Sequence, residues 1–444
     1  MAAVRGGHTE TLRWLYTHVT RDPVGPWPAV IDALRRGHNE TVKFMFTLPG
    51  EQHGYYYAEA VRIAAENGDL EMLQWLLANC NNSNLMFYTM DAAANGGHWH
   101  IVEWLHAHYP KAGSYWAMAN AARRGDLEMV KWLHVNRTEG CKTWAMDYAA
   151  LHGHIDVLEW LHVNRSEGCS TTAMSFAATQ GHLPVVKWLH RNKKDGLGSE
   201  AMDGAAERGQ LEVLQFLHKA RIEKCSPAAV DLAAGSGHLE VIQWLLANRS
   251  EGCTFKAMNA AAANGHLAVV KWLHENRSEG CTASAMNEAA ANGHLDVVKW
   301  LHENRSEGCT SKAMDQAAAN GHLDVVKWLH ENRSEGCTSK AMDQAAVRGH
   351  LTVVKWLHAH RREGCMDTTL RDAALNRHFE VALFLSANRS EGIPIGSFWE
   401  TTMFVKIMDI AKLLHVRHPG SIDVERIRRD GGEAMRELVD YVLS

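Results

Sequence analysis

Proline is scarce in this sequence, and long apolar runs are missing. Only 9 of the 444 residues are proline, which excludes a proline-rich linker protein. No run of about 18 apolar residues, the length that a membrane-spanning helix needs, occurs anywhere. Lys and Arg total 46 against 51 Asp and Glu, so the chain also lacks the basic excess of a typical nucleic-acid-binding protein.

Sequence motifs for catalysis are missing as well. We find no nucleophile elbow, phosphate-binding loop, dinucleotide fingerprint, zinc-protease helix or Cys-x-x-Cys pair. We therefore predict that the protein is not an enzyme and that it has no catalytic residues, no cofactor and no metal site.

What the sequence has in excess is one short pattern. The copy that starts at Cys309 reads CTSKAMDQAAANGHLDVVKWLHENRSEG, and copies of it recur with a period of 28. One glycine column keeps the register in thirteen copies, at positions 7, 37, 68, 97, 125, 153, 181, 209, 237, 265, 293, 321 and 349. A fourteenth copy has Arg377 in this place. A period of this length is typical of a solenoid, in which each unit buries its apolar face against its neighbours.

Each copy predicts two helices joined by a tight turn. Thr310 is a suitable N-cap for the first helix, and Gly321 ends it because the turn needs a positive φ. The second helix starts near Leu323 and carries an apolar stripe. We expect Asn332, in the recurring Asn-Arg-Ser triplet, to end the second helix in a left-handed conformation rather than to carry a glycan. No segment alternates as a strand would.

Tryptophan and histidine follow the same period. The column of Trp328 is Trp in eleven copies and Phe in three, which we interpret as buried packing between repeats; loss of one such side chain would cost about 3–5 kcal/mol. Most of the 28 His residues lie in two columns, those of His322 and His330, and we interpret both as structural.

Eight of the nine cysteines fall one to a repeat, at positions 141, 169, 225, 253, 281, 309, 337 and 365. Equivalent atoms of stacked helices lie roughly 8–10 Å apart, beyond the ~7 Å between Cα atoms that a disulfide allows. We therefore expect reduced, buried or half-buried thiols and an intracellular protein, cytoplasmic or nuclear, with no membrane contact.

The segment AMDQAAANGHLDVVKWLHENRSEG resembles the ankyrin repeat. Ala-Met-Asp-x-Ala-Ala stands where that family has Pro-Leu-His-x-Ala-Ala, and GHLDVVKWL is similar to its Gly-His-x-x-Val-Val-x-x-Leu. The resemblance implies an all-α helix-turn-helix solenoid of about 14–15 repeats, with short or absent β-hairpin fingers because each copy is shorter than the family's usual repeat. Repeats with this sequence pattern also resemble the short ankyrin-like repeats of oomycete-type proteins.

We assign residues 1–392 to the repeat array and 393–444 to a degenerate repeat with a capping helix near Glu433–Leu443. The first repeat is truncated. Either a further segment precedes it, or it is half a repeat that acts as a cap.

Positions that the repeat leaves free are the candidates for function. On the exposed side of the first helix, three columns vary, those of Ser311, Lys312 and Gln316. In the N-terminal half these columns hold seven aromatic residues, Phe87, Tyr88, Tyr115, Trp116, Trp144, Tyr148 and Phe176. In the C-terminal half they hold Lys256, Lys312 and Lys340 with Glu288, Gln316 and Gln344, and Phe255 is an exception. The seven aromatic residues either form a partner-binding surface or fill gaps between less regular repeats.

The resemblance implies a non-catalytic protein-protein interaction scaffold, monomeric, that binds a partner protein along the concave face of the solenoid. Two alternatives stay open, namely an adaptor or targeting arm of a larger protein or enzyme complex, and a host-directed effector. We expect no nucleic-acid partner, because Lys alternates with Asp and Glu and forms no basic stripe.

Overall fold

All regular structure in the described part of the chain is α-helical. The computed structural model describes residues 2–18, 27–48, 53–79, 88–192, 200–220, 225–366 and 368–388. It contains helix pairs and, within those residues, no strand, which confirms the predicted all-α fold. The chain divides into an N-terminal body, residues 1–225, and a C-terminal body, residues 226–444. The predicted degenerate repeat and capping helix at 393–444 lie outside the described residues.

The described part of the N-terminal body contains eight helix pairs. Their bounds are α1 Ala2–Arg5, α2 Thr9–His18, α3 Trp27–Arg35, α4 Asn39–Phe46, α5 His53–Asn67, α6 Leu70–Ala78, α7 Thr89–Gly96, α8 Trp99–His108, α9 Tyr115–Arg124, α10 Leu127–Asn136, α11 Trp144–Leu151, α12 Ile155–Asn164, α13 Thr172–Thr179, α14 Leu183–Asn192, α15 Glu200–Glu207 and α16 Leu211–Lys219.

The described part of the C-terminal body contains six further pairs. Their bounds are α17 Ala228–Gly235, α18 Leu239–Asn248, α19 Phe255–Ala263, α20 Leu267–Asn276, α21 Ala283–Ala291, α22 Leu295–Asn304, α23 Ser311–Ala319, α24 Leu323–Asn332, α25 Ser339–Val347, α26 Leu351–His360, α27 Thr369–Leu375 and α28 Phe379–Asn388.

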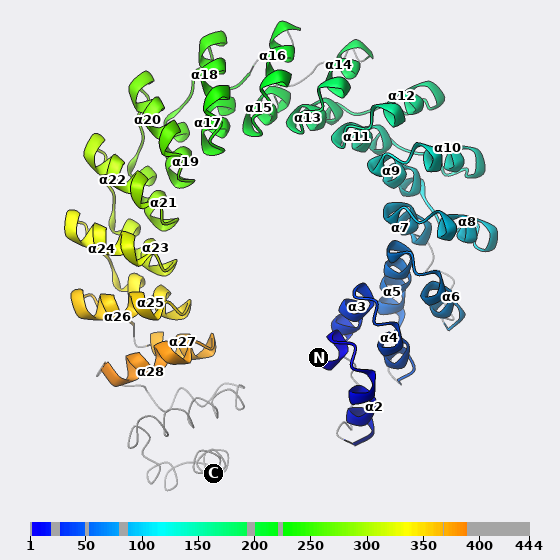
Figure 1. Ribbon diagram of the computed structural model, residues 1–444, viewed down its shortest axis with the longest axis horizontal. Coiled ribbons are helices and arrows are strands. Elements are labelled where there is room, and N and C mark those ends of the chain that lie inside the picture. The colour runs from blue at the N-terminus through cyan, green and yellow to red at the C-terminus, as the bar shows by residue number, and fades with distance from the viewer. Residues whose placement is uncertain are drawn as a thin grey trace. The chain divides into compact units, whose positions relative to one another are not determined.

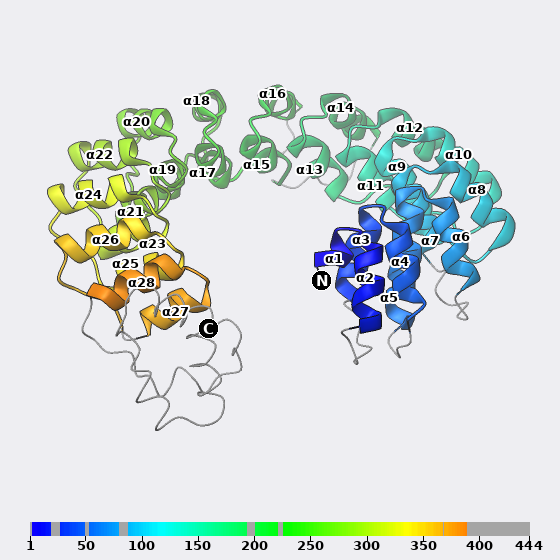
Figure 2. The same ribbon diagram turned by 60° about the horizontal axis from the view of Figure 1, so that its bottom comes forward.

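Within each body the helices form two layers (Figures 1 and 2). First helices, which have odd numbers, pack directly against one another within each body, from α1 to α15 and from α17 to α27. Their buried side consists of small or flexible residues such as Ala313, Met314 and Ala317, which let the helices approach closely. Second helices contact one another less closely, and the first helices line the inner side of each body's curve (Figure 1).

The turn between the two helices depends on glycine. Gly321 has a φ of +84°, and the other predicted turn glycines also have positive φ. Arg377, which replaces glycine in the fourteenth copy, keeps the same conformation with a φ of +67°. The predicted role of this column is confirmed.

The ends of the helices follow the prediction at the first helix and differ at the second. The Thr310 hydroxyl accepts a hydrogen bond from the backbone N–H of Lys312 and caps α23, as predicted. Asn332 is not left-handed. It is the last residue of α24, and its side-chain amide donates to the carbonyl of Trp328, 2.9 Å away. The asparagine side chain thus folds back onto the last helical turn, and the backbone does not reverse at this residue.

The tryptophan column lies between repeats, as predicted, but its members are half-buried rather than buried, except Trp14, which is 56% exposed. The ring of Trp328 meets the edge of His302 from the preceding repeat, with 5.2 Å between ring centroids and an interplanar angle of 83°. Arg333 lies against the same histidine, because its Nη1 donates to Nδ1 of His302 across 3.3 Å. The second histidine column is therefore a structural seam between repeats.

Several repeat boundaries carry a buried polar contact that was not predicted from the sequence. Asp315 lies on the buried side of α23, where its carboxylate accepts hydrogen bonds from the backbone N–H and the hydroxyl of Thr338, at 2.7 and 2.8 Å. Thr338 is the N-cap of the next first helix. In other repeats Asn takes the same role, and Asn287 contacts Thr310 through both amide atoms.

A short loop takes the place of a β-hairpin finger. In the loop 333–338 the Arg333 guanidinium pairs with Glu335, and the same pair recurs in six other repeats. None of the described cysteines forms a disulfide, and two of them are buried while six are half-buried, as predicted. Burial raises the pKa of the Cys281 thiol to about 11, which keeps it protonated.

The boundary contact predicts a contrast between two substitutions. Asp315→Ala leaves the backbone N–H and hydroxyl of Thr338 without an acceptor and is expected to lower the free energy of unfolding by about 1–3 kcal/mol. Asp315→Asn restores the arrangement that Asn287 already makes and should cost much less. Urea unfolding of both variants measures the difference, and equal losses would contradict the proposed role of the contact.

The free energy of unfolding should depend on pH through His350, which lies in the turn column. Burial and the nearby Arg348 lower the pKa of His350 below its ordinary 6.5. The folded chain therefore favours the neutral imidazole, so this contribution to stability is present above pH 6.5 and is lost as the pH falls through the lowered value. Gln210 occupies the same column beside Gly181, so His350→Gln is a matched variant. It should lose less stability than the natural chain between about pH 7.5 and about pH 5.5; an equal loss in urea unfolding counts against the assignment.

Candidate functional site

Four of the seven predicted aromatic residues form one cluster on neighbouring first helices. Tyr115 and Trp116 begin α9, and Trp144 and Tyr148 lie on α11. Trp116 stacks on Trp144 with 6.3 Å between ring centroids and lies 6.2 Å from the ring of Tyr148. Tyr115 is 5.4 Å from Trp116, and Trp144 is 5.6 Å from Tyr148. We call these four residues the aromatic cluster.

Helical geometry explains why the cluster faces outward. Trp144 and Tyr148 are four residues apart on α11 and therefore share one face of the helix. Ala145 and Met146 between them point into the core and are buried. Trp144 remains 41% exposed, and the other three residues of the cluster are half-buried. The rings thus pack mainly on one another and on the helix surface, with one face open.

The other three predicted residues do not join this cluster in the described part of the chain. Tyr88 precedes α7 and is 61% exposed. Phe176 is half-buried on α13, and no ring contact links it to the four. Phe87 lies outside the described residues.

Cations flank the aromatic cluster at both ends. The Lys142 ammonium lies 4.1 Å from the ring centroid of Tyr115, a cation–π contact. At the other end of α9, Arg123 and Arg124 follow the aromatic pair by two helical turns. His152 lies close to Arg123, and burial together with that arginine lowers the pKa of the imidazole, so it adds no charge at neutral pH.

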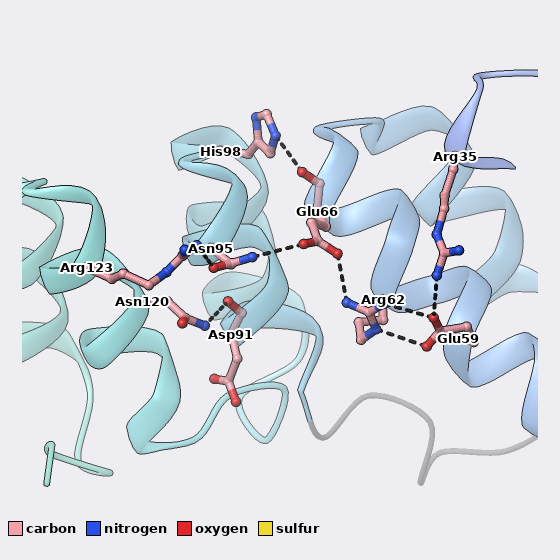
Figure 3. Close-up of polar contacts among 9 residues, drawn as sticks. All are labelled: Arg35, Glu59, Arg62, Glu66, Asp91, Asn95, His98, Asn120 and Arg123. Carbon is pink, nitrogen blue, oxygen red and sulfur yellow. Dashed lines mark hydrogen bonds and ion pairs between the residues drawn. The ribbon is translucent and has the colours of Figure 1, made fainter. Parts of the chain in front are cut away.

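A polar chain of side chains leads along the first helices toward Arg123 (Figure 3). The carboxylate of Glu59 accepts from Arg35 and Arg62, and Arg62 also pairs with Glu66 at 2.7 Å. The hydrogen bonds from Arg62 lower the pKa of Glu59 below its ordinary value.

The chain of contacts then crosses two repeat boundaries. Asn95 donates to Glu66 across 2.9 Å, and Arg123 donates to the side-chain oxygen of Asn95. These contacts could not be predicted from the sequence, because their residues lie in variable columns and meet only when repeats stack.

The C-terminal body presents a different face. Lys256, Lys312, Lys340, Glu288, Gln316 and Gln344 are exposed on its first helices, as predicted. Phe255 is 45% exposed. The polar half and the aromatic half of the varying columns are therefore both observed.

The described residues contain no group of three or more His, Cys, Asp or Glu placed to hold a metal ion. Nor does any helix among them have the length and apolar character needed to cross a membrane.

Stacked helix pairs of this kind define a helical repeat solenoid within each body. Family models then identify the repeats: the model for ankyrin repeats (3 copies) matches residues 230–315, and the model for ankyrin repeats (many copies) matches 115–162 and 146–190. The chain therefore carries ankyrin repeats in these regions, in agreement with the resemblance of the repeat sequence. The same helix pair and positive-φ glycine continue outside the matched residues.

Other comparisons add little. No curated protein sequence matches the chain. Among solved structures, the pentatricopeptide repeat protein PPR10 in complex with an 18-nt psaJ RNA element matches at 13% identity and a TM-score of 0.41, covering 99% of this chain and 75% of that one. The structure of PPR10 from maize matches at 12% identity and a TM-score of 0.35, covering 97% and 72%. Likeness at these TM-scores carries no argument about function.

The exposure of the cluster predicts how α11 responds to substitution. Trp144→Ala should change the free energy of unfolding by less than about 1 kcal/mol, since the side chain is 41% exposed and its contacts are with other surface rings. Met146→Ala on the same helix removes a side chain that is only 3% exposed and should cost about 2–5 kcal/mol. Urea unfolding compares the two, and a loss at Trp144 as large as at Met146 would show that the aromatic rings serve packing.

Proposed function

We propose that this protein is a non-catalytic scaffold that binds a partner protein through the exposed side of its first helices at 88–176. The observation that carries the proposal is the aromatic cluster, four rings from two adjacent repeats gathered on one open surface. Ankyrin repeats generally mediate protein-protein interactions, and this surface lies within the residues matched by their family model.

The chemistry of the cluster suits an anchor point for binding. Trp and Tyr are enriched among residues that dominate binding energy, because they bury a large area at a small cost in conformational entropy. Contacts between the rings hold them in place before a partner arrives, so less ordering is required on association. The same columns in the C-terminal body are mostly polar and lack such an anchor.

We also propose an intracellular location for the scaffold. The described cysteines, none of which forms a disulfide, support it, since reduced thiols are typical of a reducing compartment.

Affinity capture with the full chain tests the proposed surface. We expect Trp116→Ala/Trp144→Ala/Tyr148→Ala to lose the partner by roughly 30-fold or more, the equivalent of about 2 kcal/mol for one dominant anchor. Phe255→Ala/Lys312→Ala/Gln316→Ala changes the corresponding columns of the C-terminal body and is the matched control. Equal capture by both variants, with both still folded by circular dichroism, would exclude the cluster as the binding surface.

A further inference from the structure

The first helices that carry the aromatic cluster offer no exposed carboxylate. In α9, residues Tyr115–Arg124 include neither Asp nor Glu, and in α11 the only acid is Asp147, which is buried. The Asp147 carboxylate accepts the backbone N–H of Ser170 in the next repeat, so it is part of the repeat boundary and not of the surface.

Three cations on the same surface lack a carboxylate partner. Lys142 lies over Tyr115 and is exposed. Arg123 donates to the Asn95 side chain, and the exposed Arg124 donates to the Asn95 carbonyl. Within the described residues, no carboxylate lies at ion-pair distance from any of these three side chains.

This excess of positive charge is local. On α5, Arg62 is neutralised by Glu59 and Glu66. The whole chain carries a formal net charge of −5. The aromatic cluster is therefore bordered by cations that have no carboxylate partner, although the chain as a whole carries a net negative charge.

We propose that the segment bound by this surface is an acidic peptide stretch with one large apolar or aromatic anchor residue. The inference rests on the proposed function and specifies its partner. The anchor contacts the aromatic cluster, while carboxylates on either side pair with Lys142 and with Arg123 and Arg124. Charge-assisted hydrogen bonds to arginine favour carboxylates in particular.

Helix geometry sets the spacing within the bound segment. Trp116 and Arg123 are seven residues apart, which is about 10 Å along α9. An extended peptide advances about 3.3 Å per residue. A carboxylate about three residues from the anchor therefore reaches the arginine pair when the anchor contacts Trp116.

Single-stranded nucleic acid also stacks on aromatic rings and pairs with cations. The surface favours the acidic peptide, because the positive charge does not continue along the neighbouring first helices. Arg62 on one side is paired, and α15 on the other side carries Glu200 and Glu207. A phosphate backbone needs a longer basic track than these two helices provide.

Phage display tests the inference. The full-length protein is the bait, and peptides are selected from a library of short random sequences. We expect enrichment of peptides with Asp or Glu about three residues from Trp, Phe or Leu. The charge-reversed bait Arg123→Glu/Arg124→Glu should select Lys or Arg at that position instead. Lys312→Glu/Lys340→Glu, which reverses exposed lysines in the C-terminal body, should select the same peptides as the natural chain.

Binding measurements complete the test. A selected acidic peptide should lose about tenfold or more in affinity on Arg123→Glu/Arg124→Glu, and should also weaken on Lys142→Glu and with added salt. No enrichment, enrichment without acidic residues, or the same peptides on the charge-reversed bait would overturn the inference. So would tighter binding of a uridine homopolymer than of the best peptide to the natural chain.

The outcome is separable from that of the proposed function. If the aromatic triple variant loses its captured partner while Arg123→Glu/Arg124→Glu retains it, the scaffold proposal stands and the acidic segment is wrong. If neither variant affects capture, the surface itself is wrong.

Discussion

The stacking of this protein depends on a close contact between the turn glycine of one repeat and the turn residue of the next. A Cβ atom added to Gly321 would lie 2.7 Å from Nδ1 of His350, too close for any side chain. Glycine is therefore required at position 321 for two reasons: the backbone has a positive φ, and a larger side chain would collide with His350. Gln210 and Arg124 fill the equivalent space beside Gly181 and Gly97, so the space matters more than the imidazole.

The other residue columns of the repeat either hold the stack together or are free to vary. Ala and Met bury the first helices, Asp or Asn joins several first helices to the next N-cap, and Arg and Glu close the loop. What remains is the outward side of the first helix, where the residue can change without disturbing the stack. The aromatic cluster and Lys142 occupy that side, whereas Arg124 also packs against the turn glycine Gly97. Folding and the proposed binding therefore depend on largely different columns of the repeat.

Local physical rules predicted much of this fold from sequence. The positive φ of Gly321 and the Thr310 cap follow from one residue and its immediate neighbours. Asn332 was assigned the wrong local structure, because a side-chain bond to the carbonyl four residues earlier competes with the left-handed turn. The Asp315 contact was missed, since its partner lies 23 residues away and becomes adjacent only in the stack. For the candidate site, the sequence predicted the columns but neither the contact between rings nor the unpaired cations.

The contact between Asp315 and Thr338 has close equivalents at several other repeat boundaries, such as Asp91 with Ser114 and Asn287 with Thr310. In these repeats the first helix carries an acceptor, either Asp or Asn, that suits the following N-cap. A whole repeat can therefore be inserted or removed in register, and both new neighbours still meet a compatible partner. Recombination between near-identical copies would change the array by whole repeats while leaving each such junction intact. The length of the array could therefore change in evolution without a change in the proposed binding surface.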